Sequence, residues 1–154
     1  MKSRLFIKHF LILLIIGLSA IAVSWVLIEN RIKTELGKWI ENELTAQARI
    51  IAIIDEKEIK SRVPVLSKET RTRITIVDVQ GKVISDSGVR DQMDSHLNRP
   101  EIQEARLKGK GSAIRYSQTM KTNMLYVAVP MYVGTEIKGY VRISRPLSEV
   151  DETI

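Results

Sequence analysis

The sequence predicts an α+β protein: an N-terminal transmembrane helix that continues into a long amphipathic helix, then a domain built on a five-stranded antiparallel sheet. Three observations lead to this fold class. Residues 10–28 form an uncharged apolar run of membrane-spanning length, and apolar residues then recur at three- to four-residue steps as far as about residue 60. Beyond Pro64 the period changes to two, which is typical of strands.

The apolar run over residues 10–28 reads FLILLIIGLSAIAVSWVLI and contains no charged residue. As a helix it is ~28 Å long, which is about the thickness of the hydrocarbon core of a bilayer. Lys2, Arg4 and Lys8 precede it, so the positive-inside tendency predicts a cytoplasmic N-terminus for residues 1–9 and an extracytoplasmic position for the chain after residue 29. Trp25 stands near the outer end, where an indole ring suits the membrane interface.

A cleaved signal peptide is the alternative interpretation of this run. Ala20, Ile21 and Ala22 have the small-x-small form that signal peptidase accepts, and cleavage near Ala22 would release a secreted or periplasmic binding module. The apolar sequence continues as VSWVLI past that point, which favours an uncleaved anchor.

The chain has 154 residues, a net charge of +6 and no cysteine. The absence of cysteine excludes disulfides, thiolate metal sites and cysteine nucleophiles. Residues 1–34 carry five basic residues and one acidic residue, whereas the rest of the chain carries 19 basic and 17 acidic residues. The excess of basic residues near the apolar run is therefore a membrane-topology signal, and we expect no nucleic-acid partner. We also expect no cofactor.

Residues 29–63 predict a long amphipathic, membrane-proximal helix, continuous with the membrane span from about residue 8 to about residue 60. The apolar residues of this helix form a stripe along one side. Such a stripe must be buried against a sheet or a partner chain, so we expect a homodimer through this helix. The stripe consists of Ile32, Leu36, Ile40, Leu44, Ala48, Ile51 and Ile59.

Residues 64–147 predict the globular body. A hairpin is expected from residues 71–78 and 82–86, joined by a turn at Gly81. A polar loop leads to a short helix that starts at Pro100 and ends at Gly109 and Gly111. Residues 112–119, 123–132 and 137–145 then form three strands, the middle of these apolar on both faces as expected of a central strand.

Residues 148–154 predict the start of another helix, because Ser148 and Asp151 have the spacing of a capping box. The order of elements is that of PAS-like sensor modules. Several stretches also resemble the extracytoplasmic PAS-like domain of phosphate-regulon-type sensor histidine kinases over about residues 72–152. They are DS at 86–87, MDSHLNRPEIQEA at 93–105, GKGS at 109–112, IRYS at 114–117, MLYVA at 124–128, VR at 141–142 and PLSEVD at 146–151.

The resemblance implies the sensing region of a two-component receptor in a bacterial inner membrane. Members of that family have a second transmembrane helix and cytoplasmic kinase domains, which would contact a response regulator. This chain contains no phospho-accepting histidine motif and no ATP-binding boxes, so we expect it to be a fragment or truncated product that is not itself an enzyme, with a full-length protein that is a histidine kinase. A stand-alone membrane modulator of a kinase is a further alternative.

Arg115, Tyr126 and Arg142 are the candidate ligand-binding residues. Arg73, Arg115 and Arg142 fall on three different strands, and two of them can hold an anion if they meet on one face of the sheet. Alternation places Arg115 and Arg142 opposite the apolar faces of their strands and lets Tyr126 line a small pocket. The competing interpretation is that this face is exposed to solvent and that the arginines are ordinary surface residues.

Other polar residues give weaker signals. His9 lies at the membrane edge and His96 in the loop before the short helix, where a loop–helix hydrogen-bonding role is expected for His96. Asp86, Asp91 and Asp94 have the oxygen ligands that a divalent cation prefers, but three carboxylates in a polar loop are usually solvated, and no metal site is predicted. The sequence shows no nucleophile–base pair.

Overall fold

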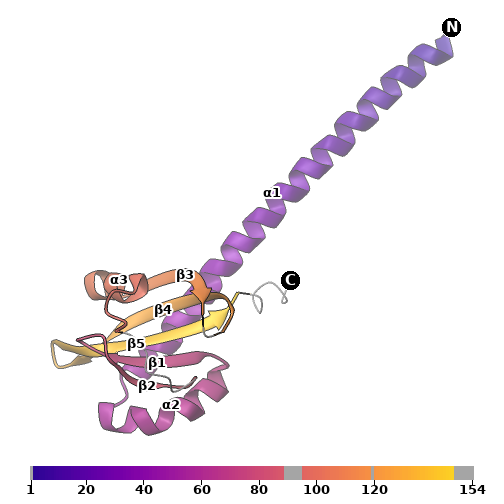
Figure 1. Ribbon diagram of the computed structural model, residues 1–154. Helices are drawn as coiled ribbons and strands as arrows, with labels where there is room; N and C mark the ends of the chain where they lie inside the picture. Colours follow the sequence, from indigo (N-terminus) through magenta and orange to yellow (C-terminus); the bar gives the residue numbers. More distant parts are fainter. Residues whose placement is uncertain (1, 89–94, 119, 148–154) are drawn as a thin grey trace. The chain divides into compact units, whose positions relative to one another are not determined.

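The computed structural model describes residues 2–88, 95–118 and 120–147. It contains two compact units, one up to Lys38 and the other from Trp39 onward. The elements follow the predicted order, with α1 spanning both units (Figure 1). They are α1 (Lys2–Ala52), α2 (Glu56–Thr70), β1 (Arg73–Asp78), β2 (Val83–Asp86), α3 (Pro100–Lys108), β3 (Gly111–Ser117), β4 (Thr122–Val133) and β5 (Glu136–Pro146).

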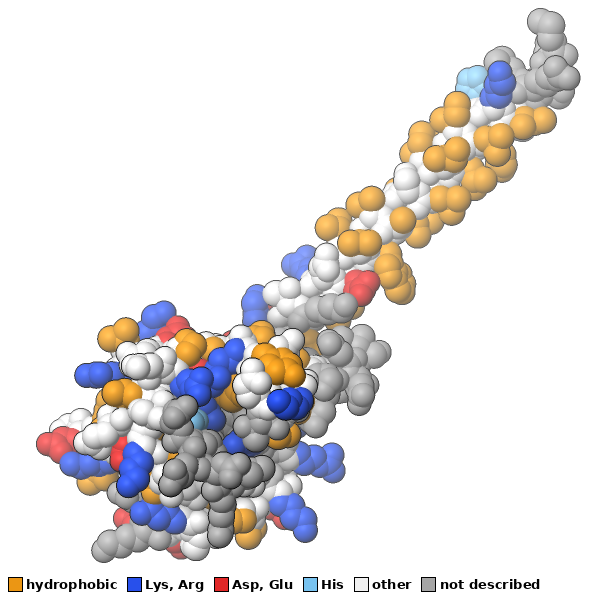
Figure 2. Space-filling view, in the orientation of Figure 1, with side chains coloured by type: hydrophobic (Ala, Val, Ile, Leu, Met, Phe, Trp, Pro, Cys, Tyr) orange, Lys and Arg blue, Asp and Glu red, His pale blue; other side chains and the backbone are white. Residues whose placement is uncertain are grey.

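The first unit is the N-terminal part of α1, and its apolar side chains from Ile7 to Ile32 are exposed. A helical stretch from Ile7 to Ala52 contains an 18-residue window with a mean hydropathy of 2.8, none of which is buried. Figure 2 shows hydrophobic side chains along the visible side of this helix, with charged side chains gathered before and after them. By length and composition this segment can cross a bilayer.

The long helix is not continuous to residue 60 as the sequence pattern predicts, and that expectation is wrong. α1 ends at Ala52 and α2 begins at Glu56. The backbone oxygen of Asp55 accepts hydrogen bonds from the backbone nitrogens of Glu58 at 3.0 Å and Ile59 at 2.9 Å, which starts a new helix. An aspartate three residues before a glutamate is a helix-start signal that we did not use.

Pro64 does not end the helical segment, which is a second correction. It lies inside α2, which continues to Thr70. A proline in a helix interior removes one backbone hydrogen bond. Ile59 and Val63 on the same helix are completely buried, and this burial stabilises α2 across the missing bond.

The sheet is antiparallel, with the strand order β2-β1-β5-β4-β3. β5 is therefore the central strand, and not β4 as its apolar sequence suggests. β4 is nonetheless buried on both faces from Met124 to Met131. The predicted hairpin of β1 and β2 is present, and Gly81 has the positive φ of 86° that its turn requires.

α1 covers one face of the sheet. Arg145 Nη1 lies 3.9 Å from Glu43 Oε2 of α1, and Arg145 is on the same face of β5 as Val141 and Ile143 because alternate residues share a face. This side holds the main core. Its buried members include Ile40, Leu44, Ala48 and Ile51 from α1, with Ile74, Ile76, Val127, Val129, Val141 and Ile143 from the strands.

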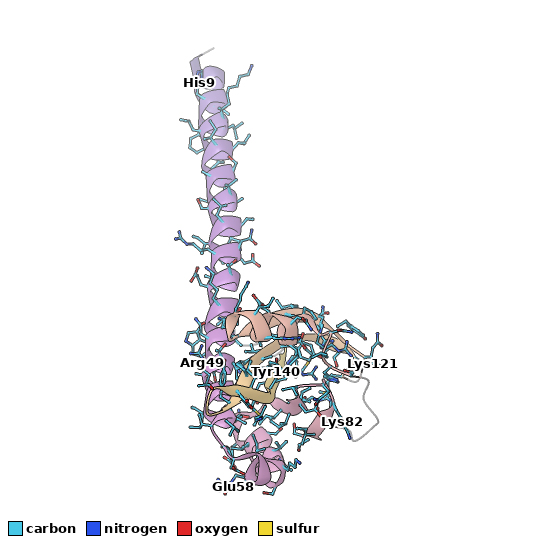
Figure 3. All side chains as sticks on the ribbon, turned by 90° about the vertical axis from the view of Figure 1, so that its left-hand side faces the viewer. His9, Arg49, Glu58, Lys82, Lys121 and Tyr140 are labelled. Atoms are coloured by element: carbon cyan, nitrogen blue, oxygen red, sulfur yellow. The ribbon has the colours of Figure 1, made fainter. Side chains whose placement is uncertain are left out.

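α3 covers the opposite face. Ile102 and Ala105 of α3 pack with Ala128 of β4 and Tyr140 of β5, which is labelled in Figure 3. The helix has the predicted proline in its first turn and ends on Gly109, whose φ of 74° places it in the left-handed conformation. The helix predicted at Ser148 lies outside the described residues.

Candidate functional site

The structure brings together the three candidate ligand-binding residues. Arg115 is on β3, Tyr126 on β4 and Arg142 on β5. Strand register places all three on the face covered by α3, since Arg115 pairs with Met124 and Arg142 pairs with Ala128, each two residues from Tyr126. The Cζ atoms of Arg115 and Arg142 lie 4.1 and 4.9 Å from the centroid of the Tyr126 ring. Both guanidinium groups are thus within cation–π distance of one aromatic ring.

Glu101 completes this group, and sequence reasoning did not single it out. Its Oε1 atom accepts hydrogen bonds from Nη2 of Arg115 at 2.9 Å and from Nη1 of Arg142 at 3.4 Å. Glu101 is completely buried in the first turn of α3. It directly follows Pro100 at the helix start, where an acidic residue is common, but nothing local predicts that it is buried against the arginines.

We call Glu101, Arg115, Tyr126 and Arg142 the arginine–glutamate cluster. Arg142 and Tyr126 are each 4% exposed, and the Arg115 side chain is 25% exposed. The competing interpretation of a solvent-exposed face is therefore wrong for Arg142. Burial lowers the pKa of Arg142 to about 10, and the nearby Glu101 carboxylate opposes this shift. Arg142 remains a cation at neutral pH.

Arg73, the third arginine considered, lies beside the cluster with a carboxylate of its own. Its Nε atom lies 3.0 Å from Oδ1 of Asp86. The hydroxyl of Thr75 donates to Oδ2 of Asp86 at 2.6 Å and accepts from Nη2 of Arg142 at 3.4 Å. Asp86 is thus held by protein donors. Asp91 and Asp94 lie outside the described residues, and the described part of the chain contains no group of three potential metal ligands.

Several buried polar atoms of the cluster have no hydrogen-bond partner among the described residues. They are Oε2 of Glu101 and the Nε atoms of Arg115 and Arg142. Buried polar atoms are usually paired. The cluster therefore offers one acceptor and two donors beyond the contacts that it already makes.

A close approach of α3 to β3 positions Glu101. A Cβ atom on Gly111 would lie 2.2 Å from the backbone oxygen of Glu101, so only glycine allows this spacing. The backbone nitrogen of Ser112 also donates to Oε2 of Glu104 at 3.2 Å. These contacts hold the first turn of α3 over the strand that carries Arg115.

His96 is buried, and its backbone connects the loop to its surroundings. Its nitrogen donates to the oxygen of Gly81 at 2.7 Å, and its oxygen accepts from the nitrogen of Arg99, the residue before α3, at 3.0 Å. A separate hollow of about 500 Å³ lies between the end of α1 and β4 and is lined by no member of the cluster.

Comparisons with known proteins match most of this chain to a family. Residues 52–146 match the model of the single Cache-like family. No curated protein matches the sequence significantly. These comparisons do not show the phosphate-regulon type of kinase that the sequence resembles.

Solved sensor domains share the fold at low sequence identity. The Escherichia coli DcuS sensor domain has a TM-score of 0.63 at 21% identity, over 77% of this chain and 96% of that one. The ligand-binding domain of the Campylobacter jejuni chemoreceptor Tlp3, in complex with 4-methylisoleucine, has a TM-score of 0.63 at 10% identity, over 79% and 57%. The sensor domain of the Vibrio cholerae histidine kinase DctB has a TM-score of 0.55 at 17% identity, over 61% and 38%. This chain thus spans only 57% of the length of the Tlp3 domain and 38% of the length of the DctB domain.

Proposed function

Because the chain belongs to the single Cache-like family, we propose that it is the extracytoplasmic sensing region of a membrane-anchored two-component sensor histidine kinase. The observation that carries this proposal is the combination of an apolar helix able to cross a bilayer with a Cache-like domain directly after it. The phosphate-regulon type is the proposed subclass, and kinase activity and response-regulator contact would belong to cytoplasmic domains of the full-length protein. In this proposal the chain itself is not an enzyme.

The predicted topology is a cytoplasmic N-terminus, a span over residues 10–28 and an extracytoplasmic domain in a bacterial inner membrane. We expect a fusion of alkaline phosphatase after Leu147 to be active and to remain in the membrane fraction, because the enzyme matures only outside the cytoplasm. The same fusion lacking residues 1–28 is the control and should be inactive. An inactive full-length fusion contradicts the proposal.

The small-x-small sequence ending at Ala22 keeps the secreted module as the alternative. N-terminal sequencing of the exported chain separates the two functions. A soluble periplasmic product that starts near Val23 supports the binding module, whereas an intact N-terminus in the membrane fraction supports the anchored receptor.

Dimerisation through α1 is part of the proposed signalling mechanism, in which a stimulus shifts the packing of paired helices. Trp39, Ala46 and Ile50 of α1 are exposed, at steps of seven and four residues. This spacing is that of a coiled-coil seam. On a helical wheel the seam lies opposite Leu44 and Ala48, which face the sheet, so it is free to meet a second copy.

A cysteine placed in this seam tests the dimer without background, since the chain has no cysteine of its own. We expect Ala46→Cys to form disulfide-linked dimers in membranes under mild oxidation, because facing seam positions approach within disulfide range. Ser61→Cys, an exposed position on α2, is the matched control. Equal cross-linking of the two variants, read on a non-reducing gel, contradicts a dimer through α1.

We also propose that the arginine–glutamate cluster is where a small-molecule stimulus acts. Arg115, Tyr126 and Arg142 remain the predicted ligand-binding residues. Support comes from their convergence on one sheet face and from the unpartnered polar atoms of Glu101 and both arginines. The related folds include chemoreceptor domains solved with 4-methylisoleucine and with L-arginine.

A further inference from the structure

The carboxylate of Glu101 lies where an anionic ligand of the two arginines would lie. It is completely buried, and two guanidinium groups from two strands point at one of its oxygens. Both guanidinium groups also lie within 5 Å of the centroid of the Tyr126 ring, at 4.1 Å for Arg115 and 4.9 Å for Arg142. A site for a carboxylate is therefore built, and a side chain of the same protein fills it.

The contacts that Glu101 makes are fewer than this site can supply. A carboxylate bound side-on to arginine accepts two parallel hydrogen bonds. Here each arginine donates a single bond from an Nη atom to Oε1, and both Nε atoms and Oε2 have no partner among the described residues. Glu101 is tethered to the first turn of α3, which limits the orientations that its carboxylate can take. A carboxylate without this tether can accept more bonds from the same arginines.

We infer that Arg115 and Arg142 form a carboxylate-binding site whose occupant is the chain's own Glu101, so that a soluble carboxylate must displace this side chain and loosen the first turn of α3. The inference rests on the proposed sensing function and specifies how it would be regulated at the same site. Ile102 and Ala105 still pack on the sheet after displacement, so α3 would shift rather than detach. The site thereby couples ligand binding to a movement of α3.

Chemical rescue tests this inference. Glu101→Ala and Glu101→Ser each remove the internal carboxylate and leave room for a soluble one. In the full chain in detergent micelles, we expect about 100 mM sodium acetate to raise the Tm of each variant by about 5 °C more than sodium chloride at the same concentration, since a ligand stabilises the state that binds it. The wild type should respond much less, because its site is occupied.

Glu136→Ala is the matched control, because it also removes a glutamate, but one that is exposed at the start of β5 and pairs with Lys138. It should show the small wild-type response to acetate. Adding Arg142→Met to Glu101→Ser should abolish the acetate effect. If Glu101→Ala does not fold, Glu101→Ser decides the question alone.

An acetate response of Glu101→Ser equal to that of the wild type overturns the inference. This failure is distinct from failure of the proposed function. A cytoplasmic alkaline phosphatase fusion would overturn the receptor topology, whereas the rescue experiment reads only the arginine site.

Discussion

Replacement of Arg142 by methionine is expected to destabilise the sheet domain by about 3–5 kcal/mol, because it removes one partner of a buried charge pair. Glu101 is completely buried and would keep only Arg115, whose side chain is partly exposed. The hydrogen bond from Arg142 to Thr75 is lost as well. Urea denaturation of the full chain in micelles, followed by near-ultraviolet circular dichroism, measures the free energy of unfolding.

Two further variants identify the cause of this loss. Arg106→Met, at an exposed position on α3, should change the free energy of unfolding by less than about 0.5 kcal/mol. Combining Arg142→Met with Glu101→Gln should recover part of the stability, because no uncompensated carboxylate then remains buried. A double variant that is as unstable as the sum of its single changes would show that Arg142 acts through packing and not through Glu101.

Replacement of Leu44 by alanine is expected to cost about 3–5 kcal/mol, the usual loss when a buried leucine is truncated and a cavity remains. Leu44 is completely buried in α1 among Ile40, Ala48 and the strands of the main core. The same denaturation experiment measures the effect.

Leu107→Ala is the matched control for this change. Leu107 lies on α3 and is 81% exposed, so the identical chemical change should alter stability by less than about 0.5 kcal/mol. Similar losses of stability in the two variants would mean that α1 does not pack on the sheet as the structure describes.

Both experiments rely on features that were predictable to different degrees. The faces of the strands follow from alternation within each strand, so Arg115 and Arg142 were correctly placed opposite the apolar core. Whether that face is buried depends on α3, a separate element, and therefore could not be read from the strands. The ligand-binding role of the three residues is still a prediction.

The helices show the same division. The stripe from Ile40 to Ile51 was predicted and is buried against the sheet. The break before α2 was missed because an apolar spacing continues through it, and Pro64 was misjudged because the burial of Ile59 and Val63 outweighs a lost backbone bond. Local preference is a weak guide where tertiary packing decides.

The sequence by itself determined the long apolar N-terminal helix, the order of the strands and of the short helix between them, the turns and the face on which each strand residue lies. These features depend on hydrophobic periodicity and turn residues within a few positions of one another. Only the tertiary structure decided that β5 is central and that Glu101 of α3 meets Arg115 and Arg142. The reason is physical: a buried ion pair between residues 41 positions apart is selected by the desolvation that packing imposes on both charges, and no local pattern records it.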